Sequence, residues 1–319
     1  MISIKNFEIV KKLGKGCFGT VYLAKHKFTG KMYAIKRVCK GNLSNNKFYD
    51  TIKREGEILE RMGRNRFVVK YYGTIHTLKY INIVMEYIDG KELFETMKKD
   101  DLNLTQIKKY ASEIVLGLKH IHSRNILFKD LKPENIMITR QEHVKFIDFG
   151  FSHTEFIDFS NFSTSIGTIE YMAPEKIRNI KDSKVSDYWA FGCVLYEMLH
   201  GHTPFFDKNK RKCIRNICKG EIFFNKEINL EMTGEEYFLL KDLIEKLLIK
   251  DYTMRLGVKG ICEIMKHGYF KNVKWQDVME KAECDKNFSC NSLKNTKTET
   301  FELDTDENLI QFEFNAFTE

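Results

Sequence analysis

Glycines at positions 14, 16 and 19 give the segment Gly14–Val21 (GKGCFGTV) a backbone that side chains barely cover. Backbone amides of such a segment can approach phosphate oxygens closely. Glycines at this spacing also occur in dinucleotide sites, but there the third glycine opens a helix. Here Thr20–Leu23 resumes a strand-like alternation,. The motif alone predicts a phosphate loop, with a plain hairpin turn as the alternative.

Lys36 follows Ala34 and Ile35 in a strand-like run, where a lysine would ordinarily extend to solvent,. In the helix-like stretch near 52–62, Ile52 and Glu55 share the apolar face, which buries the carboxylate,. Because losing one partner of a buried ion pair costs roughly 3–5 kcal/mol, we predict that Glu55 pairs with Lys36.

The densest cluster of reactive side chains is Phe128–Asn135 (FKDLKPEN), followed by an apolar run and Asp148-Phe149-Gly150. Together with the glycine loop, Lys36 and Glu55, in this order, it resembles the eukaryotic protein kinases. The resemblance implies an α+β, two-lobed fold: a small antiparallel-sheet lobe with one helix and a larger, mainly helical lobe. It also implies ATP and Mg²⁺ as cofactors.

The resemblance also assigns roles. Asp130 would accept the proton of the substrate hydroxyl, Lys132 would contact the γ-phosphate, and Asn135 and Asp148 would hold Mg²⁺. Phosphoryl transfer needs alignment and neutralised phosphate oxygens, which such groups provide. Tyrosine kinases usually lack a lysine at position 132, so serine or threonine is the expected acceptor. The other residues implied at the nucleotide site are Leu13, Gly14, Gly16, Gly19, Val21, Ala34, Lys36, Glu55, Glu86, Ile88 and Glu92.

Four passages resemble the AGC group of kinases, and the cAMP-dependent protein kinases within it, over about residues 7–275. They are Val84–Tyr87, Asp148–Phe151, Asp251–Gly257 and His267–Phe270. The tail segment Phe314–Phe317 is similar to the hydrophobic motif of that group. By the same resemblance, Asp187 braces the catalytic loop, Arg255 pairs with Glu175, and Thr164 and Thr318 are candidate phosphorylation sites.

Acidic residues occupy the positions at which basophilic relatives bind arginine: Glu92, Glu134, Glu170 and Glu197. An exposed ion pair contributes only about 0.2–1 kcal/mol, but several together favour protein substrates with basic residues before the phosphoacceptor. Thr168, Ile169 and Met172 complete the expected peptide site, the last two as an apolar pocket.

The sequence departs from the family where Lys129 replaces an arginine that binds phosphate on the activation segment, which weakens a pocket for phosphorylated Thr164,. Thr51 and His153 stand at the positions where the other partners of that phosphate are expected. Ser163 and Ile169 depart from residues of the cAMP-dependent kinases. An inhibitory regulatory subunit is therefore a possible partner that the sequence does not decide. The alternatives are an AGC-like kinase without cyclic-nucleotide control, a pseudokinase or scaffold, and an enzyme acting on a small metabolite.

The chain has 319 residues, 43% of them hydrophobic, and a net charge of +8. Its basic residues are spread and mixed with acids, which argues against nucleic acid. No apolar run is long enough to span a bilayer, and eight scattered cysteines favour reduced thiols in the cytoplasm or nucleus,. We predict an N-lobe at 1–86, a C-lobe at 87–270 and a tail at 271–319.

Periodicity predicts antiparallel strands within 7–38 and two more near 66–73 and 80–88. A long amphipathic helix is expected over 107–121. Further helices are expected near 48–62, 184–200, 210–219, 235–249 and 261–267, and irregular structure over 271–319.

Overall fold

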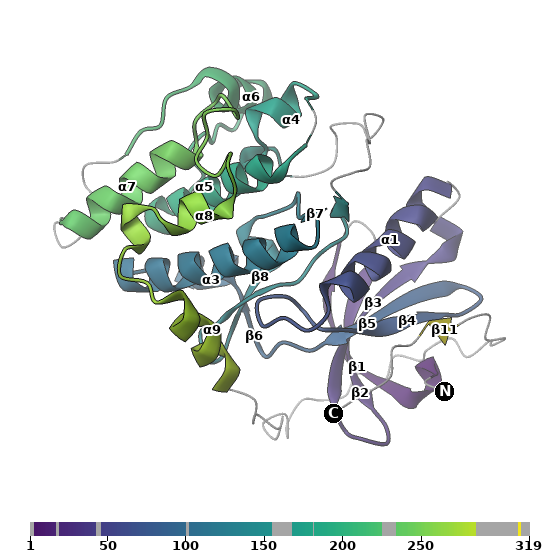
Figure 1. Ribbon diagram of the computed structural model, residues 1–319. Helices are drawn as coiled ribbons and strands as arrows, with labels where there is room; N and C mark the ends of the chain where they lie inside the picture. The colour runs from purple at the N-terminus through teal and green to yellow at the C-terminus, as the bar shows by residue number, and fades with distance from the viewer. Residues whose placement is uncertain are drawn as a thin grey trace. The chain divides into compact units, whose positions relative to one another are not determined.

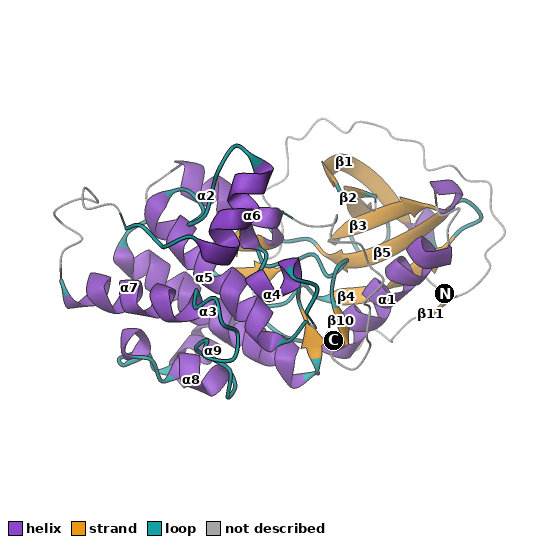
Figure 2. Cartoon of the chain, turned by 90° about the horizontal axis from the view of Figure 1, so that it is seen from above, coloured by secondary structure: helices purple, strands orange, loops and turns teal. Residues whose placement is uncertain are grey.

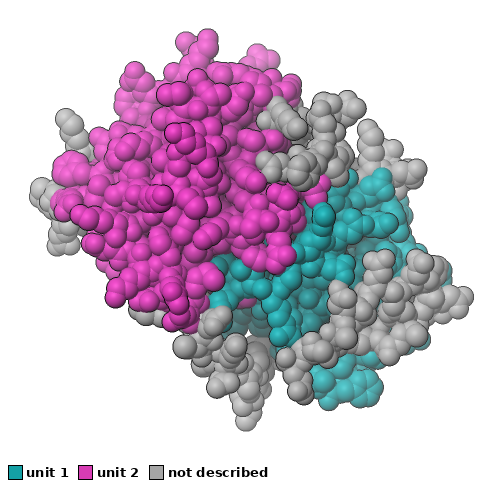
Figure 3. Space-filling view, viewed as in Figure 1, with its two compact units in different colours: residues 1–89, 284–319 teal, residues 90–283 magenta. Residues whose placement is uncertain are grey.

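The chain forms two compact units, residues 1–89 with 284–319 and residues 90–283 (Figure 3). The computed structural model describes residues 3–16, 19–42, 46–99, 102–154, 168–180, 182–224, 234–284 and 312–313. Within these ranges, no helix combines the length and the hydrophobicity that a membrane span requires.

The first unit is built on one antiparallel sheet with the strand order β1-β2-β3-β5-β4-β11 (Figure 1). Its strands are β1 (Phe7–Lys15), β2 (Thr20–His26), β3 (Met32–Cys39), β4 (Tyr71–His76), β5 (Tyr80–Glu86) and β11 (Phe312–Glu313). Successive side chains of a strand point to opposite faces, so Phe7 and Ile9 of β1 reach one core together with Tyr33 and Ile35 of β3. The antiparallel sheet expected within 7–38 is confirmed.

One α-helix, α1 (Asn46–Met62), packs against β4 of this sheet. Ile52, Glu55, Leu59 and Met62 are all buried, as their helical spacing predicts,. Two short 3₁₀ helices, η1 (Ile4–Asn6) and η2 (Lys40–Asn42), flank the strands. The helix predicted near 48–62 is confirmed and begins two residues earlier.

The second unit is mainly helical (Figure 2). Its helices are α2 (Leu93–Lys99), α3 (Leu104–Ser123), α4 (Pro174–Ile177), α5 (Lys184–His200), α6 (Lys210–Lys219), α7 (Glu235–Leu247), α8 (Ile261–Met265) and α9 (Trp275–Cys284). Asn103 and Gln106 form a capping box that starts α3,. Every residue from Val185 to Leu199 of α5 is buried, and α5 packs against α3 and α7, which makes it the centre of this core.

Within the described residues, small sheets and 3₁₀ turns frame the loops of this unit. β6 (Gly90–Glu92), β8 (Ile136–Thr139) and β9 (Val144–Phe146) form one sheet, and β7 (Ile126–Leu127) pairs with β10 (His153–Thr154). The 3₁₀ turns are η3 (Pro133–Asn135), η4 (Ile169–Tyr171) and η6 (Gly268–Phe270). The segment between β7 and η3 holds Asp130 and Lys132.

The expectation of irregular structure throughout 271–319 is wrong at two places. Residues 275–284 form α9, and Phe312 and Glu313 pair with Ile75 and Thr74 of β4. The predicted helices near 235–249 and 261–267 are present but end earlier, at Leu247 and Met265.

Candidate functional site

The glycine loop joins β1 and β2 of the first unit. Gly14 lies opposite Val21, and the amide of Gly16 donates to the carbonyl of Gly19 at 2.9 Å. A Cβ at Gly19 would lie 2.4 Å from the Arg37 carbonyl oxygen, so packing requires glycine there. A Cβ at Gly14 or Gly16 would meet nothing within 4 Å. This open space beside bare backbone fits the phosphates of a nucleotide.

Lys36 and Glu55 form the predicted ion pair inside the first unit. The Lys36 ammonium donates to both carboxylate oxygens of Glu55, at 2.7 and 2.9 Å. The two side chains are only 8% and 1% exposed. The pair therefore fixes the lysine at one point of β3, which is what a phosphate-binding cation needs.

The other nucleotide-site candidates of the first unit lie on the strands of its sheet, except Ile88, which follows β5. Leu13 is 41% exposed, whereas Val21, Ala34 and Ile88 are half-buried. Glu86, at the end of β5, accepts a hydrogen bond from the Lys70 amide at 2.8 Å. Their role at a nucleotide stays a prediction.

Asp130 is held by two neighbours in the second unit. The Asn135 side-chain amide donates to the Asp130 carbonyl at 2.8 Å and to its Oδ2 at 2.7 Å, and the Lys132 ammonium lies 2.9 Å from the same Oδ2. Both side-chain contacts use Oδ2, which leaves Oδ1 as the oxygen for an incoming hydroxyl. Asn135 bonds through its nitrogen, so its oxygen is the atom suited to a cation.

Asp187 of α5 holds the backbone just before Asp130. Its carboxylate accepts from the amides of Phe128 and Lys129, at 2.9 and 2.8 Å, and from His122 Nε2 at 2.8 Å. Burial opposes ionisation, but these hydrogen bonds favour the charged form and lower the pKa of Asp187,. Lys129 has a φ of 68°, an uncommon conformation for a residue with a side chain,. The predicted bracing contact is present.

Asp148 follows β9 and is the second candidate metal ligand. Its Oδ1 accepts from the Gly150 amide at 3.0 Å, and the adjacent Phe149 is fully buried, edge-on to Phe128 at 5.1 Å between ring centroids. The described part of the chain holds no cluster of three His, Cys, Asp or Glu that suits a metal ion. Mg²⁺ in nucleotide sites needs only one or two carboxylates besides substrate phosphates, so the oxygens of Asn135 and Asp148 fit it.

The four glutamates predicted for peptide binding influence one another. Burial raises the pKa of Glu197 to about 7, the hydrogen bond from the Tyr171 hydroxyl opposes the shift, and Glu134 and Glu170 add to it. Burial also raises the pKa of Glu92, helped by Glu95 and Glu134. The acids therefore form one cluster of negative potential.

This cluster includes a buried oxygen without a partner, Glu134 Oε2. Glu170, by contrast, accepts from the Thr203 hydroxyl at 2.8 Å. Thr168 is exposed beside them, and Ile169 and Met172 are half-buried at the ends of η4. A cationic ligand would satisfy the charge that the protein leaves uncompensated here.

Comparison with known proteins identifies the family. The protein kinase domain model matches residues 7–270. The chain belongs to the protein kinase family. It is 39% identical over 280 residues to a probable cAMP-dependent protein kinase catalytic subunit of Encephalitozoon cuniculi, covering 87% of this chain and 84% of that one. It is 32% identical over 280 residues to cAMP-dependent protein kinase type 3 of Saccharomyces cerevisiae, covering 87% and 67%. It is also 35% identical over 280 residues to serine/threonine-protein kinase Sgk1-B of Xenopus laevis, covering 86% and 62%.

These relatives confirm the predicted kinase fold and a protein serine/threonine kinase of AGC type.

The second unit also contains the predicted buried pair of Glu175 with Arg255, whose guanidinium nitrogens lie 2.6 and 2.9 Å from the two carboxylate oxygens. Three expectations fall outside the described residues: phosphorylation of Thr164 and Thr318, the departure at Ser163, and the tail motif Phe314–Phe317.

The surroundings of Lys129 contain a residue that sequence reasoning missed. The Lys129 ammonium lies 2.6 Å from Asp182 Oδ2 and 2.7 Å from His153 Nε2. Asp182 precedes α5 in a polar, loop-like stretch, and no pattern in the sequence marks it as a partner of the catalytic loop.

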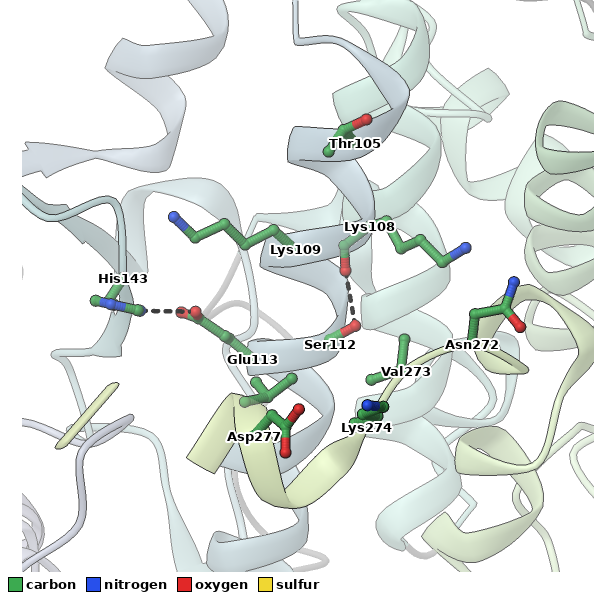
Figure 4. A pocket seen from close by; sticks show the side chains of 11 residues that line it. Thr105, Lys108, Lys109, Ser112, Glu113, His143, Asn272, Val273, Lys274 and Asp277 are labelled. Atoms are coloured by element: carbon green, nitrogen blue, oxygen red, sulfur yellow. Dashed lines mark hydrogen bonds and ion pairs between the residues drawn. The ribbon is translucent and has the colours of Figure 1, made fainter. Parts of the chain in front are cut away.

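A pocket of about 570 Å³ between α3 and residues 272–278 is unrelated to these residues (Figure 4). Two of its lysines already have partners: Lys108 lies 3.1 Å from Glu236 and Lys109 lies 3.3 Å from Glu142. Its acid Glu113 binds His143 at 2.8 Å. These three charged side chains are therefore engaged in contacts within the protein.

Proposed function

We propose that this kinase transfers the γ-phosphoryl group of ATP to serine or threonine residues that follow basic residues in protein substrates. The observation that carries the proposal is the arrangement around Asp130, whose Oδ2 is occupied by Asn135 and Lys132 while Oδ1 is available. A carboxylate fixed in this way can orient a hydroxyl and take its proton.

The residues of each unit supply distinct parts of this reaction. Bound ATP with Mg²⁺ supplies the phosphoryl group and neutralises its charge. Lys36, fixed by Glu55, would bind the α- and β-phosphates, and Asn135 and Asp148 would hold the metal through their oxygens,. Lys132, already beside Asp130, would place its positive charge on the transferred group,.

The acidic cluster of Glu92, Glu134, Glu170 and Glu197 supports the preference for basic substrates. Burial raises the pKa values of Glu92 and Glu197, and Glu134 adds to both shifts, so a cation bound here gains more than it would beside an isolated carboxylate,. Arginine suits such a site because its guanidinium can bind two carboxylate oxygens at once. Two of the relatives described above are named cAMP-dependent. Control by a cyclic-nucleotide-binding subunit is not part of this proposal, because Ile169 departs from the pattern that the family resemblance implies.

The test is transfer from γ-labelled ATP with Mg²⁺ to an Arg-Arg-x-Ser-apolar peptide. We expect label on the serine peptide, much less on a peptide with alanine in place of both arginines, and none on a tyrosine peptide. Asp130→Asn should lower kcat by roughly 10²–10⁴ while ATP affinity stays the same. ATP binding without transfer to any peptide would instead indicate a pseudokinase, and equal use of the alanine peptide would refute the basic preference.

A further inference from the structure

Lys129, the residue before Asp130, is held at every polar group. Asp187 accepts its amide at 2.8 Å, and the Lys176 ammonium donates to its carbonyl at 3.3 Å. Its own ammonium lies 2.6 Å from Asp182 and 2.7 Å from His153. A left-handed residue such as this one, with φ of 68°, costs about 1–3 kcal/mol and persists only where its surroundings enforce it,.

His153 and Asp182 both contact the Lys129 ammonium, but only one of them neutralises its charge. His153 is uncharged at neutral pH, because burial, and then Lys129, lower its pKa to about 4. Its Nδ1 bonds to the Thr154 carbonyl at 3.1 Å, so Nε2 is the acceptor for Lys129,. The negative charge comes from Asp182, whose side chain is 17% exposed. Without this carboxylate a largely buried ammonium would remain uncompensated.

Asp182 is also positioned to act on the main chain of the catalytic loop. Its second oxygen, Oδ1, is buried without a hydrogen bond and lies 3.9 Å from the Lys176 ammonium, the group that donates to the Lys129 carbonyl. One carboxylate thus attracts both lysines that fix the residue before Asp130.

From this geometry we propose that Asp182 is a positioning residue for phosphoryl transfer: its carboxylate holds Lys129, and through it Asp130, in the catalytic conformation. This inference rests on the proposed kinase activity. It changes the expectation for Lys129, which the family resemblance assigned to a phosphate on Thr164. Because the Asp182 carboxylate is a permanent part of the chain, the loop that contains Lys129 and Asp130 should adopt its catalytic conformation without phosphorylation.

The test is a double-mutant cycle of Asp182→Asn and Lys129→Met, with kcat, KM for ATP and melting temperature measured for each protein. Asp182→Asn should lower kcat roughly 10- to 100-fold, since misplacing a catalytic group by about 1 Å can cost 10²-fold. KM for ATP should stay within about twofold. The kcat of the double variant should be no lower than that of the less active single variant. Asp182→Glu should keep at least half of the wild-type kcat.

The matched control is Asp242→Asn, which replaces a carboxylate of α7 that lies 2.7 Å from Lys246 and 2.9 Å from His267, and it should leave kcat unchanged. The proposal would be overturned if Asp182→Asn left kcat unchanged, or if the fold-losses in kcat of the two single variants multiplied in the double variant. Activity lost when the wild type is treated with phosphatase would overturn it too, because the carboxylate would then be insufficient. A wild type that is inactive before treatment would instead refute the proposed function.

Discussion

If Glu197 binds the substrate as proposed, substrate recognition should depend on pH in a range that can be calculated. Burial raises the pKa of its carboxyl from 4.5 to about 7. The ionised fraction should therefore rise from about 10% at pH 6 to about 90% at pH 8. If an arginine of the substrate binds only the carboxylate, kcat/KM for a basic peptide should rise about tenfold over this range.

The same shift affects stability, with the opposite sign. A carboxyl whose pKa is raised by folding binds its proton more tightly in the folded state, so its contribution to stability is complete below about pH 4.5 and is lost as pH rises through about 7,. The shift from 4.5 to about 7 corresponds to a loss of about 3 kcal/mol at most,. Glu197→Gln removes the ionisable group and should make the free energy of unfolding less dependent on pH.

The assay compares kcat/KM from pH 6 to pH 8 for the wild type, Glu197→Gln and the control Glu245→Gln, which alters an exposed glutamate of α7. Peptides with either arginine replaced by alanine identify the one that binds Glu197. We expect Glu197→Gln to lose the tenfold rise for the basic peptide and the control to keep it. An unchanged rise in Glu197→Gln, or an equal rise for both alanine peptides, would refute the assignment.

Three further perturbations test the buried charges that hold the site. Glu55→Gln should destabilise the first unit by roughly 3–5 kcal/mol in denaturant titrations, since Lys36 loses its partner, and should raise KM for ATP; unchanged stability would contradict the pairing,. Arg255→Ala should cost a similar amount because the buried Glu175 loses its cationic partner, and a loss below about 1 kcal/mol would contradict that view,. Asp187→Asn weakens two amide contacts to a charged acceptor, each worth about 1.5–3 kcal/mol, and should lower the melting temperature and kcat together; loss of either alone would argue against bracing,.

Sequence reasoning succeeded where a local pattern carries the information. The periodicity of α1 places Glu55 on a buried face, and a buried carboxylate requires a cation, so Lys36 follows from physical chemistry,. The helix predicted near 184–200 is likewise present as α5. Motif order predicted that Asp130 and Asn135 act together, and the structure places their side chains 2.7 Å apart; their catalytic roles stay predictions,.

It failed where the deciding contact is between distant segments. β11 has two residues, and only pairing with β4 makes it a strand. α9 has only ten residues, and because many of them are exposed, its sequence is polar enough to resemble a loop. Asp182 stands in a polar stretch before α5, and its partner Lys129 becomes visible only when the chain has folded. Local propensity carries no information about such contacts.

The segment from β7 to η3 shows why so many buried charges surround a short loop. Its residues are in neither a helix nor a sheet, so the amides of Phe128 and Lys129 have no backbone partners, and buried amides without partners are costly,. Side chains from outside the loop provide the missing partners. Asp187 from α5 accepts hydrogen bonds from both amides, and Asp182 pairs with the Lys129 ammonium. A regular element would satisfy the amides more simply, but it would impose its own geometry on Asp130. The proposed role of Asp130 requires it to be fixed at a point outside any regular element, and the Asp187 carboxylate, anchored in the buried helix α5, holds the backbone beside it,.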